Sequence, residues 1–98
     1  MSDDEFAFAP PPFNADNALA QMKRNLRDLK LAERGNAFEL RGKRVLELTL
    51  DQGAIAARLA RKLALTPEWD RLRVNNTNEQ RKLLDEVKKR MARWDHED

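Results

Sequence analysis

The spacing of apolar residues changes along this chain, and this change limits the fold to a mixture of helices and strands. Between positions 15 and 34 the apolar residues recur at intervals of three or four, which is typical of one buried face of a helix. Leu46, Leu48 and Leu50 instead alternate with polar residues, as in a half-buried strand. The sequence therefore predicts a small single α+β domain.

Local signals place the first helix at residues 15–34. Asn14 is a favourable N-cap, and Gly35 is a favourable residue just after a helix end. The apolar stripe of this helix consists of Leu19, Met22, Leu26 and Leu29. We expect this stripe to face the core.

The alternating segment 37–50 predicts a β-hairpin that turns at Gly42. Phe38 and Leu40 before the turn, and the three leucines after it, then lie on one face. Leucine, glutamate, arginine and lysine are also good helix formers, so a helix in this segment, and with it an all-α helical bundle, remains the alternative.

Two further helices are predicted before the C-terminal one. Asp51 can cap a helix that runs to Leu65, with the alanine density and length of the segment favouring helix over strand. Thr66 and Pro67 then form a start signal for a short helix that carries Trp69.

The last helix has the clearest signals. The sequence from Thr77 to Gln80 has the form of a capping box, and residues 78–94 follow as an amphipathic helix. Its predicted inward residues are Leu83, Leu84, Val87, Met91 and Trp94. The full predicted order is helix, β-hairpin, helix, short helix, long C-terminal helix.

The folded part is expected to span residues 14–94, between an N-terminal arm (1–13) and an acidic tail (95–98). The arm combines Phe6 and Phe8 with a run of three prolines that favours polyproline II and excludes a helix interior. Aromatic residues are scarce in disordered segments because such segments bury nothing. We expect the arm to pack on its own domain, with docking on another protein as the alternative.

The residue inventory argues against a conventional enzyme. The chain has no Cys, no Tyr and one His, although these side chains supply most nucleophiles, general bases and transition-metal ligands. His96 lies among acidic residues at the end of the chain, where a fixed metal site is not expected. The sequence predicts no catalytic residue, no cofactor and no metal.

Residues 51–60 resemble the first helix of a helix-turn-helix, since Gln52, Ile55 and Leu59 match its spacing. The resemblance implies that residues 66–73 form a recognition helix for DNA. The segment departs from the pattern because no glycine turn follows Leu59, and because Glu68 and Asp70 would meet phosphates unfavourably.

Charge is distributed unevenly along the chain. Residues 6–94 carry 19 Lys and Arg against 11 Asp and Glu, so a basic body lies between two acidic ends. Such a body can meet an anionic partner. The leading expectation is a non-enzymatic protein-interaction or accessory module, and the alternative is a protein that binds DNA or RNA through a basic helical surface.

The candidate partner-binding residues combine the arm with the basic positions. They are Phe6, Phe8, Pro11, Arg58, Arg61, Lys62, Lys88, Lys89 and Arg93. The sequence has no apolar run long enough for a membrane span, an acidic start and no cysteine. We therefore expect no membrane partner and a cytoplasmic location.

Overall fold

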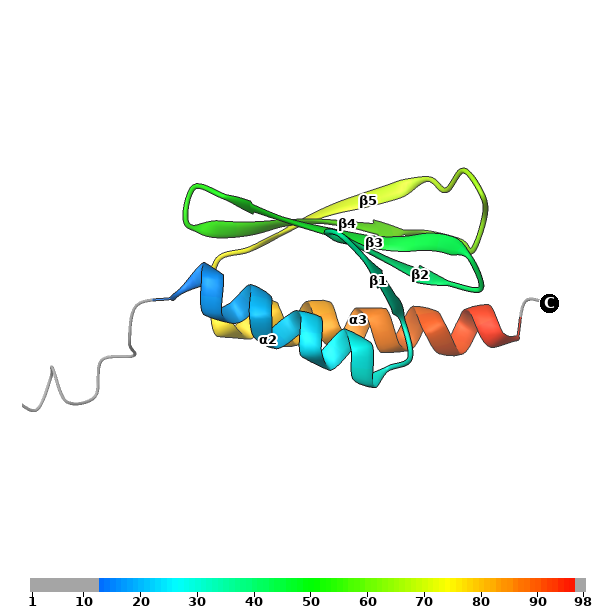
Figure 1. Ribbon diagram of the computed structural model, residues 1–98, viewed down its shortest axis with the longest axis horizontal. Helices are drawn as coiled ribbons and strands as arrows, with labels where there is room; N and C mark the ends of the chain where they lie inside the picture. The colour runs from blue at the N-terminus through cyan, green and yellow to red at the C-terminus, as the bar shows by residue number, and fades with distance from the viewer. Residues whose placement is uncertain (1–12, 97–98) are drawn as a thin grey trace, which may run out of the picture.

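The computed structural model describes residues 13–96, which form a five-stranded antiparallel sheet with two helices on one face (Figure 1). The strands lie in the order in which they occur in the chain, so each is paired only with its sequence neighbours. The elements are α2 (Ala15–Asp28), β1 (Ala32–Arg34), β2 (Ala37–Leu40), β3 (Lys43–Asp51), β4 (Ala54–Ala60), β5 (Trp69–Val74) and α3 (Thr77–Asp95). The mixed α+β class is confirmed, and the all-α alternative is wrong.

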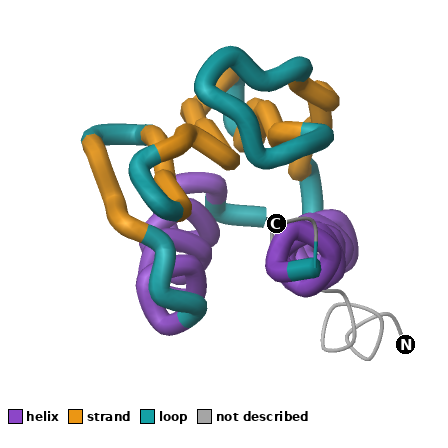
Figure 2. Tube along the Cα trace, turned by 90° about the vertical axis from the view of Figure 1, so that its right-hand side faces the viewer, coloured by secondary structure: helices purple, strands orange, loops and turns teal. Residues whose placement is uncertain are grey.

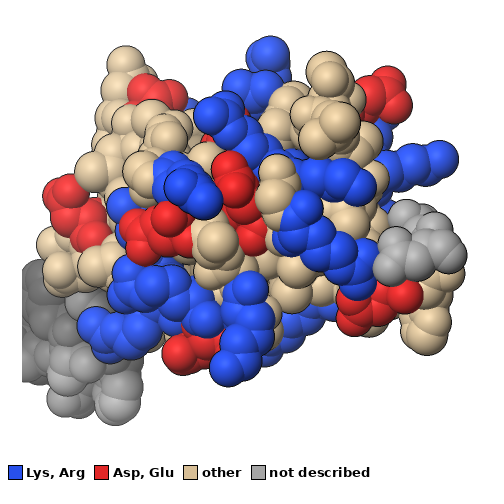
Figure 3. Space-filling model, turned by 45° about the vertical axis from the view of Figure 1, so that its right-hand side comes forward, with Lys and Arg blue, Asp and Glu red and all other residues tan. Residues whose placement is uncertain are grey.

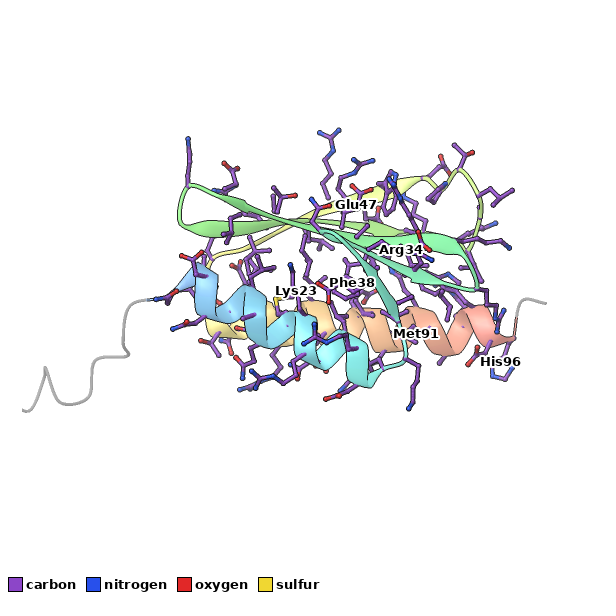
Figure 4. All side chains as sticks on the ribbon, in the orientation of Figure 1. Lys23, Arg34, Phe38, Glu47, Met91 and His96 are labelled. Carbon is purple, nitrogen blue, oxygen red and sulfur yellow. The ribbon has the colours of Figure 1, made fainter. Side chains whose placement is uncertain are left out.

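Both helices cover the same face of the sheet and leave the other face open (Figure 2). The core between the layers contains fully buried side chains from each helix and from four strands. The largest of them are Trp94, Phe38, Met22, Leu26, Leu46, Leu48, Ile55 and Leu59. In Figure 4 Phe38 lies between the sheet and the helices.

Helix α2 starts where the sequence indicates, because the Asn14 side chain accepts a hydrogen bond of 3.0 Å from the Asn17 N–H. It ends at Asp28, six residues earlier than predicted. Lys30 has a φ of 74°, and the N–H of Leu31 donates to the carbonyl of Leu26, which together form a Schellman-type helix end. No glycine marks this helix end, and residues 32–34 form a strand instead.

The predicted hairpin at 37–50 is confirmed as β2 and β3. Arg41 and Gly42 both have positive φ, 55° and 78°, as a two-residue type I′ turn requires. The register shifts after Phe38, so that Val45 has no partner on β2 and forms a bulge. The bulge explains why the consecutive Val45 and Leu46 are both fully buried.

The predicted helix at 51–65 is wrong. Gln52 and Gly53, with φ of 51° and 77°, form a second turn of the same kind, and β4 follows it. Ile55 and Leu59 then face the helices from an extended backbone rather than from a helix. The predicted helix-turn-helix is wrong for the same reason. Residues 51–73 form the end of β3, then β4 and most of β5 with their connections.

The predicted short helix after Thr66 is also wrong, because Trp69–Val74 form β5. Helix α3 is confirmed, with Leu83, Val87 and Trp94 buried and Leu84 and Met91 partly buried. Its N-cap is Asn76 rather than Thr77, since the Asn76 side chain accepts from the Glu79 N–H at 2.8 Å. The helix continues through Asp95, whose carboxylate lies 3.0 Å from the Arg41 guanidinium.

Candidate functional site

The open face of the sheet carries arginines on neighbouring strands. Glu47 of β3, Arg58 of β4 and Arg71 of β5 are direct cross-strand partners, and so share one face. Thr49, Ala56 and Arg73 form the adjacent row on this face. Figure 4 shows Glu47 and Arg34 on the side of the sheet away from the helices.

Arg58 is fixed by two neighbours. Its Nη1 lies 3.1 Å from a Glu47 carboxylate oxygen, and its guanidinium carbon lies 4.8 Å from the centre of the Trp69 ring. A guanidinium over an aromatic ring is a favourable cation–π arrangement. Trp69 is therefore a half-buried residue of the open face that also packs against the core.

Arg73 and Arg71 differ in their environment. The Arg73 guanidinium donates to the Asp51 carboxylate at 2.8 Å and to the Asp51 carbonyl at 3.0 Å. Arg71 is exposed, and no ion pair or hydrogen bond of its side chain occurs among the described residues. Like charges directly opposite each other destabilise a strand pair, and in the pair of Arg58 and Arg71 the described residues give an ion pair to Arg58 alone.

A pocket of about 380 Å³ lies at the β5 edge on the helix-covered side of the sheet, between the start of the β4–β5 loop, Asp70 of β5 and α3. Its lining residues are Arg61, Lys62, Asp70, Arg90 and Arg93. Asp70 accepts from Arg61 Nε at 2.8 Å and lies 2.9 Å from Arg90 Nη2. Arg90 also donates to Glu86 at 2.8 Å and to the carbonyl of Ala60 at 3.0 Å.

These contacts shift the pKa values of ionisable side chains in and beside the pocket. Hydrogen bonds from Arg61 and then Arg90 lower the pKa of Asp70, and the Asp70 hydrogen bond raises the pKa of Arg61. The Arg90 hydrogen bond similarly lowers the pKa of Glu86. The pocket therefore holds charged groups at neutral pH.

The structure brings together some of the sequence-predicted residues and separates others. Arg61, Lys62 and Arg93 line one pocket, whereas Arg58 lies on the open face of β4. Lys88 lines a different groove, between α2 and α3, and Lys89 is exposed on α3. Phe6, Phe8 and Pro11 lie outside the described residues, so the arm prediction stays a prediction.

The sequence reasoning missed Trp69, Asp70, Arg71 and Arg90 as site residues. Trp69, Arg71 and Arg73 alternate along β5, which is the pattern of one strand face. That pattern was hidden by the assignment of this segment to a helix. Arg90 lies four residues after Glu86 on α3, and the two side chains form an ion pair of 2.8 Å.

The carboxylates with lowered pKa values make the protein sensitive to acid. Hydrogen bonds from Arg27 lower the pKa of Glu33, as those from Arg61 and Arg90 lower that of Asp70. A folded pKa below the ordinary value gives stability that is present at neutral pH and is lost as the pH falls through the folded pKa. We expect the urea midpoint to fall between about pH 6 and about pH 3.

The urea midpoint of Asp70→Asn should depend less on pH than that of the wild type, because this variant lacks one of the carboxylates with a lowered pKa. Asp85→Asn is the matched control, since Asp85 is an exposed α3 carboxylate with no ion pair among the described residues. Equal pH dependence in Asp70→Asn and the wild type would contradict this assignment.

Comparisons with known proteins assign no function to this surface. Neither described helix is long and apolar enough to cross a membrane. Within residues 13–96 no group of three His, Cys, Asp or Glu side chains is placed to hold a metal ion. No protein-family model matches the chain, and no curated protein or solved structure is significantly similar to it.

Proposed function

We propose that this protein is a non-enzymatic module that binds nucleic acid, with a single strand lying across the open face of the sheet. The observation that carries the proposal is the row of Arg58 and Arg71 beside Trp69 on this face. Arg71 has an exposed guanidinium without a partner in the described part of the chain. A phosphate group would supply the missing anion.

The overall charge of the described residues supports an anionic partner. Residues 13–96 contain all 19 Lys and Arg but 12 of the 17 Asp and Glu, which leaves a net charge of +7. The face in Figure 3 shows the basic side chains as a broad band that a few acidic side chains interrupt. A positive surface of this kind attracts a polyanion and accelerates its association.

The chemistry of the open face favours a single strand over a duplex. Bases of a single strand can stack on aromatic rings and on the flat faces of guanidinium groups, and Arg58 stacked on Trp69 offers such a surface. The neighbouring row contains the small side chains of Thr49 and Ala56, which leave room for a strand to approach the sheet. No described helix is needed as a recognition helix in this arrangement.

The test is a salt titration with a fluorescent single-stranded oligonucleotide. The logarithm of the affinity should fall linearly with the logarithm of salt, with a slope of about −0.7 per phosphate contacted. Arg71→Gln should weaken binding and reduce the slope by about 0.7, because one phosphate contact is lost. Arg24→Gln is the control, since Arg24 is an exposed α2 residue without an ion pair among the described residues.

Equal affinities for Arg71→Gln and Arg24→Gln would reject the open face as the binding surface. Tighter binding of a duplex than of a single strand would reject the single-strand assignment. The cytoplasmic location belongs to the same proposal, because a chain without cysteine suits a reducing compartment.

A protein-interaction module is the second candidate, and the outer edge of β5 favours it. β5 is the last strand of the sheet and pairs only with β4, so one row of its backbone groups has no strand partner. Leu65 in the preceding loop and Leu72 on β5 are exposed apolar residues near this edge. A partner protein retained from native lysate after nuclease treatment, and lost on changing Leu72 to Lys, would support this candidate.

A further inference from the structure

The pocket lined by Arg61, Lys62, Asp70, Arg90 and Arg93, here called the edge pocket, has the composition of an anion site. It gathers side chains from the β4–β5 loop, β5 and α3, which are up to 32 residues apart in the chain. Its volume of about 380 Å³ exceeds the space needed for one phosphate group.

Arg90 is positioned before any ligand arrives. Its side chain is only 14% exposed and is held by Glu86, Asp70 and the carbonyl of Ala60. A guanidinium has five N–H groups in a fixed fork, and these three contacts use one N–H on each of its nitrogens. One N–H therefore remains on each of its two terminal nitrogens.

The other basic residues add adaptable donors at the rim. Arg61 commits its Nε to Asp70, which leaves its terminal nitrogens available for a second acceptor. Lys62 is exposed and forms no ion pair among the described residues. Arg93 is held close to this group by a contact of 3.4 Å with the carbonyl of Arg61.

The lining of the pocket favours an anionic ligand. It contains four cationic side chains, and Asp70 is the one carboxylate among the lining residues. Planar guanidinium groups bind phosphate through paired hydrogen bonds, and lysine adds a point charge.

We propose that the edge pocket binds a phosphate group with free anionic oxygens, the chemistry shared by the phosphorylated end of a nucleic-acid strand and by inorganic phosphate. The first source rests on the function proposed above, because Asp70 of the pocket and Arg71 of the open face are consecutive residues of β5, so the pocket and the open face meet at the β5 edge. The second source does not depend on that function.

The first experiment titrates inorganic phosphate into the full chain and follows the arginine Nε–H signals by NMR. The Arg61 and Arg90 signals should shift, with a dissociation constant of about 1 mM. Lys62→Gln and Arg93→Gln should each weaken binding about tenfold, since hydrogen bonds to charged groups are the strong ones. Arg24→Gln should leave it unchanged.

Asp70→Asn tests the proposal through an expected increase in phosphate affinity rather than a decrease. This variant keeps the shape of the side chain but removes the internal anion that competes for Arg61 and Arg90. Phosphate should then bind more tightly than to the wild type, by about tenfold. A thermal melt of each variant verifies that it is folded.

The second experiment compares oligonucleotides with a 5′-phosphate, a 3′-phosphate or hydroxyl ends. A terminal phosphate should increase the affinity, and Lys62→Gln should abolish the increase without changing the affinity for the hydroxyl-ended strand. If the terminal phosphate has no effect and inorganic phosphate shifts no pocket signal, the edge-pocket proposal is wrong. Loss of oligonucleotide binding alone, with phosphate binding intact, would reject the proposed function and leave the pocket assigned to free phosphate.

Discussion

Changing Ala57 to aspartate is expected to unfold the protein, whereas the same change at Ala56 leaves it folded. Ala57 is 2% exposed and lies between Leu48 and Leu72 on the face covered by the helices. A carboxylate there has no partner, and leaving a charge buried and unpaired costs at least about 3–5 kcal/mol, a large part of the stability of a small domain.

Ala56 is the matched control because it lies one residue away on the open face. Its direct partner on β5 is Arg73, so an aspartate at this position faces an opposite charge across the strands. Urea unfolding of both variants, followed by circular dichroism, measures the difference. Equal stability of the two variants would contradict the strand assignment of residues 54–60.

The second large loss of stability is expected when Trp94 is substituted. Its side chain is fully buried near the end of α3, and Trp→Ala substitutions in a core typically cost about 3–5 kcal/mol. The indole Nε1 is also a buried donor with no hydrogen-bond partner. Trp94→Phe should therefore lower the free energy of unfolding by less than the lost side-chain volume alone suggests, because it removes that unpaired group.

Chemical denaturation of Trp94→Ala and Trp94→Phe separates the two contributions. Val87→Ala provides a smaller core change on the same face of α3, since Val87 is also fully buried. An unchanged urea midpoint for Trp94→Ala would show that the C-terminal part of α3 does not pack on the sheet.

The sequence predicted the elements whose signals are local. Asn14 caps α2 by its own side chain, and Gly42 turns the first hairpin with a φ of 78°. The last helix has the predicted apolar stripe, although its N-cap is Asn76 rather than the predicted Thr77. In each case the residues that decide the structure are neighbours in the chain.

The failures occurred where strand pairing and packing outweigh the local helix preference of the residues. Alanine-rich residues 54–60 have high helix propensity, which is a weak force compared with packing between two neighbouring strands. Ile55 and Leu59 fit one face of a helix, whereas the alternation of Ile55, Ala57 and Leu59 fits a strand. The Gln52–Gly53 turn was the deciding signal, and glutamine at a positive φ is rarely anticipated.

The candidate site was predictable only as a set of basic residues. Arg61, Lys62 and Arg93 were identified by charge, but their meeting in one pocket depends on β5 and α3 lying side by side. The role of Trp69 depends on a strand face that the helical assignment excluded. Side chains brought together by sheet register have no signature in a single sequence.

The order of the elements also determines how the chain folds as it leaves the ribosome. Each strand pairs with the one made just before it, so the sheet can form hairpin by hairpin with little loop entropy to overcome. Helix α3, however, comes last of the described elements, and Val87 and Trp94 are the side chains that complete the buried layer. Until residue 94 has emerged, the nascent chain presents part of the apolar inner face of its sheet to the surroundings, and this is the stage at which it most needs a chaperone.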